Sequence, residues 1–163
     1  MTNQPSLDNV KRLLLLALDE TFFKTHGMYI DKGTSFFETL AGITPAEASS
    51  AASSQSATIA AQLDHARLYL DVINNYLRTR EDPKIDWREI WETVRGVTPD
   101  EWEALKQRFQ ESHARVMATI NLLEDWSSEH EFGSALAVLV HTAYHLGGIR
   151  QALGVIRAGE NTK

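Results

Sequence analysis

His141 and His145 stand one helical turn apart in VHTAYHLGGIRQAL, a stretch that is otherwise largely apolar and helix-forming. On a helical wheel the two positions are about 40° apart, so both imidazoles point to the same side. Burying an imidazole costs free energy unless its nitrogens find partners. A shared metal ion is one such partner. Backbone carbonyls or water molecules, one for each ring, are the simpler alternative, and spacing alone leaves both open.

A third histidine, His65, lies in TIAAQLDHARLYLDVIN. On the predicted helix, Gln62 and Tyr69 lie on the same face as His65. This face flanks a stripe of leucines and points away from the charged side of the helix. Three inward imidazoles from two helices suit a divalent metal ion with a coordination position left open. Gln62 and Tyr69, one turn on either side of His65, are predicted to line that open face.

Gly147 and Gly148 follow the last histidine closely. A glycine within a helix costs about 1 kcal/mol relative to alanine, so the pair needs a reason. Gly148 shares the stripe of the two histidines, where a missing side chain would leave space above a metal ion. Close packing of two helices explains the glycines equally well.

The other histidines are weaker candidates. His113, between Phe109 and Val116 on a helical repeat, is the one serious rival as a ligand, whereas His26 and His130 are expected to be ordinary polar residues. The sequence identifies no catalytic residue. Imidazole ligands suit nickel, zinc, iron and copper alike, so the ion's identity stays open. Tryptophans and tyrosines near these positions are expected in the core or at an interface rather than as a substrate platform: Trp87, Trp91 and Tyr69.

Several other chemistries are excluded. The chain has no cysteine, which removes disulfides, thiolate metal sites and a cysteine nucleophile. None of the six histidines follows a glutamate by three residues, as ferritin-like di-iron sites require. The HExxH, GxSxG, Walker and GxGxxG motifs are also missing.

Helical periodicity dominates the chain, and strand patterns are nearly absent. ITPAEAS and VTPDEWE both place Thr at a helix cap, Pro after it and Glu at the third position, so helices should begin near Pro45 and Pro99. The last helix is apolar on almost every side and is expected to be the most enclosed.

We predict an all-α protein, a four-helix bundle with additional short helices in one domain over residues 1–158, followed by a frayed tail over 159–163. The long helices are predicted over 6–25, 54–78, 99–126 and 131–157, with shorter ones ending at 42 and spanning 86–95.

The composition is that of an ordinary globular protein, with 163 residues, 43% of them hydrophobic and 23% charged. The net charge of −6 argues against nucleic acid as a partner. The apolar run over 13–18 is too short to span a bilayer and lacks a cleavage site. We therefore expect a cytoplasmic protein that acts on a small molecule, away from membranes.

Four segments, in this order, resemble the DinB-like superfamily: SFFETLAGITPAEAS, TIAAQLDHARLYLDVIN, DWREIWETV and LVHTAYHLGGIRQAL. The family comprises bacterial four-helix bundles that bind a divalent metal through one histidine on the second helix and two on the last. That pattern falls on His65, His141 and His145. Many relatives continue with Arg-Gly-Gln after the last ligand. This chain has Leu146-Gly147-Gly148 instead, so no role of that Arg or Gln is carried over.

The resemblance implies a metal-dependent enzyme, because characterised relatives include S-transferases that use low-molecular-weight thiols and a thiol-dependent isomerase. A thiol-dependent S-transferase or a hydrolase, with nickel, zinc, iron or manganese and a low-molecular-weight thiol, is the leading hypothesis. The resemblance also implies a homodimer. The alternative is a non-catalytic binding or stress-associated bundle whose metal is structural or absent. A third possibility places His65 toward solvent and the other pair in the core. If the three rings do hold a metal, binding should weaken below about pH 6.5, the pKa of a free imidazole.

Overall fold

The computed structural model describes residues 6–81, 83–88, 91 and 94–160. In this part of the chain the secondary structure is helical, apart from an isolated bridge between Ala51 and Thr58. The all-α prediction is therefore confirmed. The helices with defined bounds are α1 (Leu7–Phe22), α2 (Phe36–Ala41), α3 (Pro45–Ala48), α4 (Ile59–Thr79), α6 (Pro99–Asn121) and α7 (Glu129–Glu160).

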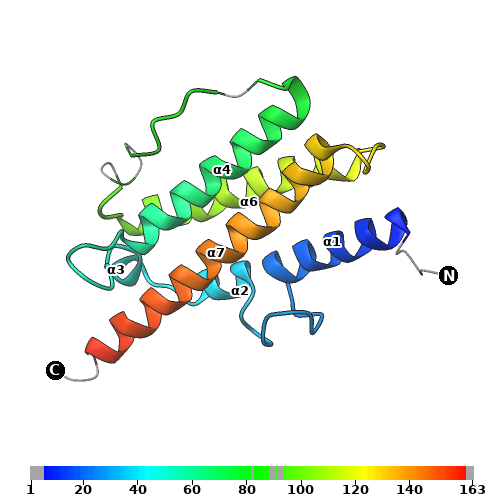
Figure 1. The fold of residues 1–163 in the computed structure, drawn as a ribbon. Coiled ribbons are helices and arrows are strands. Elements are labelled where there is room, and N and C mark those ends of the chain that lie inside the picture. The colour runs from blue at the N-terminus through cyan, green and yellow to red at the C-terminus, as the bar shows by residue number, and fades with distance from the viewer. Residues whose placement is uncertain (1–5, 82, 89–90, 92–93, 161–163) are drawn as a thin grey trace.

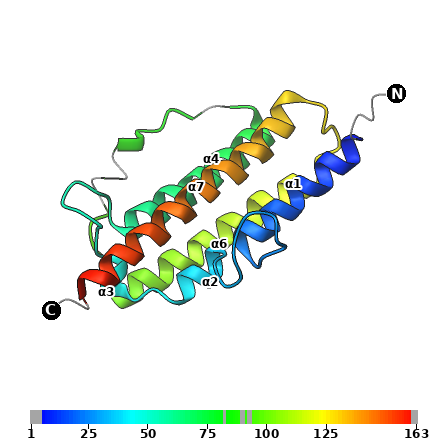
Figure 2. The same ribbon diagram turned by 60° about the horizontal axis from the view of Figure 1, so that its bottom comes forward.

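The four long helices lie side by side in two layers, with α4 and α7 in one and α1 and α6 in the other (Figures 1 and 2). Helices α4 and α6 run in the same direction, so the connection between them returns along the length of the molecule (Figure 1). Trp87 and Trp91 belong to this connection. The predicted short helix over 86–95 lies partly outside the described residues, and positions 87, 88 and 91 are helical.

The predicted caps set the helix starts. Thr44 and Thr98 each close a capping box with the glutamate three residues later, and Ser6 caps α1. The second long helix begins at Ile59 rather than near residue 54, because the Thr58 hydroxyl accepts the Ala61 amide and residues 53–56 form a turn. The helix that starts at Pro99 ends at Asn121, five residues earlier than predicted.

Helix α7 is not the most enclosed helix, contrary to the sequence prediction. Leu136, Val140 and Tyr144 are 39%, 59% and 74% exposed. Composition alone does not show which side of an apolar helix lacks a neighbour, and the main neighbours of α7 are α4 and α1. Among the described residues α7 is also long and apolar enough to cross a membrane by length and composition. A core helix meets the same test, and the buried side of α7 belongs to the core.

Helix α4 is held by an apolar stripe on one side and by polar pairs on another. Leu63 and Leu70 of the predicted leucine stripe are fully buried. On the charged side, Arg115 of α6 donates a 2.8 Å hydrogen bond to Asp71, and Thr119 donates a 2.6 Å bond to Asn74. These bonds between polar side chains fix the rotation of α4 about its axis, and with it the direction in which His65 points.

Helix α7 is tied to its neighbours near both ends. Near its start, His130 shares a 2.8 Å hydrogen bond with Tyr76 of α4, and Glu131 forms an ion pair with Arg80. Near its end, Arg157 donates a 2.7 Å hydrogen bond to Glu47 of α3. Because both ends are held, the register of α7 against α4 is fixed over the turns between them.

We predict that Glu47→Ala lowers the free energy of unfolding by about 2 kcal/mol, because it removes the Glu47 half of the α3 capping box and the ion pair with Arg157. Glu47→Gln, which keeps a cap acceptor, should cost about half as much. The hydrogen bond from Arg157, aided by those from Thr44, holds the pKa of Glu47 below its usual value despite burial. The ion-pair contribution is therefore present above the pKa of an unfolded glutamate and lost as the pH falls through the lowered value.

Urea unfolding at pH 7 and at pH 3 measures both effects. Glu103→Gln is the control, because the Glu103 side chain is 70% exposed and its pair with Lys106 should contribute little. An equal cost of Glu47→Gln and Glu103→Gln at pH 7 would contradict the role of the Glu47 pair.

Candidate metal centre

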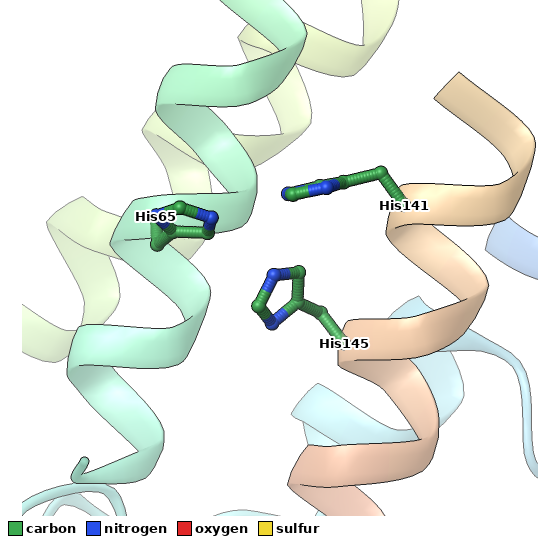
Figure 3. A group of neighbouring side chains, drawn as sticks. All are labelled: His65, His141 and His145. Atoms are coloured by element: carbon green, nitrogen blue, oxygen red, sulfur yellow. The ribbon is translucent and has the colours of Figure 1, made fainter. Parts of the chain in front are cut away.

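The three histidines singled out by spacing converge between α4 and α7. Each offers a ring nitrogen that lies within 4.8 Å of those of the other two. Figure 3 shows His65 reaching across from α4 toward His141 and His145, which project from successive turns of α7. The ring centroids are 4.6 to 5.1 Å apart. The third possibility from the sequence, with His65 facing solvent, is wrong: His65 is 8% exposed.

Each of the three rings has a buried nitrogen that lacks a hydrogen-bond partner among the described residues. These atoms are His65 Nδ1, His141 Nε2 and His145 Nδ1. A buried polar atom without a partner costs about 1–3 kcal/mol, and three such atoms in one cluster are unusual. Nitrogens around a tetrahedral zinc ion are about 3.3 Å apart. One nitrogen of each ring lies within 4.8 Å of those of the other two, so small ring rotations would bring one nitrogen per ring within ligand distance of one ion.

Aromatic side chains enclose the three rings. Tyr69 stacks on His141 with centroids 3.6 Å apart, and Trp91 stacks on His65 at 4.4 Å. Trp87 meets the edge of His65 at 5.2 Å, and Tyr144 meets the edge of His145 at the same distance. The imidazoles are thus oriented by contacts with aromatic rings. Sequence reasoning did not assign this role to either tryptophan.

The cluster is electrostatically suited to a cation. Burial lowers the pKa of His141 to about 4 and that of His145 to about 3, and mutual repulsion among the rings adds to both shifts. Burial also lowers the pKa of His65, although Asp64 opposes the shift. All three imidazoles are therefore neutral at pH 7, which is the form that binds a metal ion.

The remaining histidines lie elsewhere. His113 is buried against Phe22, with centroids 4.1 Å apart, so the rival ligand belongs to an aromatic part of the core. His26 contacts Asp19, and His130 contacts Tyr76, as expected of ordinary polar residues.

Two of the three predicted lining residues border a hollow of about 300 Å³ beside the cluster. Gln62 and Gly148 line it together with His145. A Cβ atom on Gly148 would come within 2.8 Å of the Gln62 side-chain oxygen, whereas one on Gly147 would meet nothing within 4 Å. Close packing therefore explains Gly148, but not its exposed neighbour. The third lining residue, Tyr69, contacts His141 instead.

A family model described as the DinB superfamily matches residues 32–148, which is most of the chain and includes all three histidines. The chain belongs to the DinB superfamily. No curated protein and no solved structure gives a significant match.

Membership in the DinB superfamily agrees with the three-histidine cluster, since the cluster lies within the matched residues. The departure after the last histidine has a structural counterpart in this DinB protein. Leu146 is buried, Gly147 is exposed, and Gly148 touches the Gln62 side chain. Arg150 and Gln151 are exposed and line no part of the hollow beside His145.

We predict that the metal-free protein loses stability as the pH falls from about 6.5, the pKa of an unfolded histidine, toward the lowered values of about 4 and 3. The unfolded chain binds protons in this range, whereas the buried imidazoles do not. The variant His141→Ala/His145→Ala should lose less stability over the same range. Chemical unfolding at pH 7 and pH 4.5 in the presence of a chelator measures the difference, and equal losses in both proteins would contradict it.

Proposed function

We propose that this DinB protein is a divalent-metal-dependent enzyme in which His65, His141 and His145 hold the ion. The observation that carries the proposal is the convergence of three imidazoles, each of which offers one nitrogen within 4.8 Å of those of the other two. One cation could bind one nitrogen of each ring. Neutral imidazoles bind nickel, zinc, iron and copper, so the donor set fits a divalent ion.

The reaction class that we propose is a thiol-dependent S-transfer or a hydrolysis. A divalent ion in this position would supply Lewis acidity, which lowers the pKa of a thiol or a water molecule that it binds. The chain itself contributes an apolar, aromatic enclosure around the cluster. Tyr69, Trp87 and Trp91 limit access of bulk water to the imidazoles, and a lower local dielectric strengthens electrostatic effects at the site.

Within the described residues, the group that is close enough to hold an ion consists of three histidines, without a carboxylate. A three-ligand set supports a catalytic site, because a structural zinc site has four protein ligands. This observation favours the enzyme over the alternative, a binding module with a structural metal. The small-molecule substrate, the thiol, the homodimer and the cytoplasmic location remain predictions from the sequence.

We expect about one metal ion per chain in protein purified without chelators, and less than about one-tenth of that in His141→Ala/His145→Ala. Elemental analysis of both proteins measures the content and identifies the metal. His130→Ala is a matched control, because His130 lies on the same helix and is outside the cluster. Equal, near-zero metal in the wild type and the double variant would refute the site.

An exchangeable fourth position is expected on the ion. In protein reconstituted with cobalt(II), added azide or a simple thiol should change the visible absorption spectrum in a saturable way. A spectrum unaffected by azide or the thiol would favour a closed, structural site.

We also expect the protein to retain most of its metal at about pH 5.5. This is below the value of about pH 6.5 expected for free imidazole ligands, because burial lowers the pKa values of all three histidines.

A further inference from the structure

The hollow beside His145 is lined in part by aromatic side chains. Trp91, from the connection between α4 and α6, and Tyr144, from α7, both line it. Trp91 also stacks on His65, and Tyr144 lies edge-on to His145, so both rings stay beside the cluster. Tyr144 is 74% exposed, although large aromatic side chains are usually covered. Two aromatic rings in the lining favour a ligand with a flat, apolar group.

The lining of the hollow includes one primary amide, that of Gln62. The Gln62 amide lies against Gly148, and it makes no hydrogen bond to another side chain in the described part of the chain. A primary amide offers a donor and an acceptor side by side. A complementary ligand group therefore also carries a donor and an acceptor, as an amide does.

Charged ligands are disfavoured by the lining. Among the described residues that border the hollow, none is Asp, Glu, Lys or Arg; the lining consists of Ala57, Gln62, Trp91, Tyr144, His145 and Gly148. In the metal-free protein, an anion or a cation placed here would lose hydration without gaining an opposite charge from a side chain, which is costly. A neutral group would lose far less.

We propose that this hollow is a substrate subsite for an uncharged, planar group that carries an amide or a similar paired donor and acceptor. The aromatic walls of Trp91 and Tyr144 hold its flat face, and Gln62 binds its polar edge. The assignment rests on the proposed function, because the subsite matters for a reaction only if the adjacent cluster holds a metal. It places the planar part of the substrate beside His145 and any charged part outside the hollow.

Gly148 leaves room for the Gln62 amide in its present position. With a side chain there, the Gln62 oxygen would be 2.8 Å from the new Cβ, so the amide would have to shift. Gly147→Ala is a matched control, since its Cβ would meet nothing within 4 Å. Both substitutions replace a helical glycine by alanine and should therefore preserve or raise helix stability.

Binding of benzamide, benzoate and benzylammonium tests the proposal. Each is titrated into isotope-labelled protein, both metal-loaded and metal-stripped, and followed by NMR at the Trp91 indole, the Gln62 side-chain amide and the backbone amides beside Gly148. We expect saturable benzamide binding with a Kd of about 1–10 mM, and at least about tenfold weaker binding of both ions to the metal-stripped protein. Gly148→Ala and Gln62→Met should weaken benzamide binding by about three- to tenfold, and Gly147→Ala should leave it unchanged.

The experiment distinguishes failure of the proposed subsite from failure of the proposed metal site. Benzamide binding to a protein that takes up no metal when it is offered would refute the proposed function and support the subsite. A metal-loaded protein whose Trp91 and Gln62 signals do not respond to benzamide would refute the subsite alone. Benzoate or benzylammonium binding to the stripped protein as tightly as benzamide would overturn the assignment of a neutral ligand, as would equal effects of Gly147→Ala and Gly148→Ala.

Discussion

Three neutral imidazoles in one place, each with a buried nitrogen that no described group satisfies, are the constraint on which the rest of the structure depends. Burying polar atoms without partners costs free energy. The fold maintains it by fixing both helices that contribute. Hydrogen bonds from α6 set the rotation of α4, and contacts near both ends of α7 set its register.

The convergence of the histidines was predictable because helical periodicity assigns a direction to each side chain. His141 and His145 are one turn apart, and His65 flanks a leucine stripe, so the pattern predicts that all three face inward once the helices pack. The helix starts at Pro45 and Pro99 were equally well specified by their caps. The start of α4 was not, because Ser54 and Thr58 are both acceptable cap residues and only the tertiary fold selects one.

The surroundings of the cluster were less predictable for two physical reasons. Trp87 and Trp91 lie in a connection, where periodicity no longer indicates which way a side chain points, and they become neighbours of His65 only when the connection returns along α4. The exposed side of α7 was missed because apolar composition indicates a capacity for burial, not the presence of a neighbour. Both errors concern contacts between distant parts of the sequence.

The return path between the parallel helices α4 and α6 has an evolutionary consequence. The donors for an ion come from the rigid helices, while two indole rings that cover them come from a connection whose sequence the packing of the helices constrains only weakly. Replacing residues along that path would change which molecules reach the imidazoles without moving the helices that carry them. One scaffold is thereby able to diversify in selectivity without rebuilding its centre.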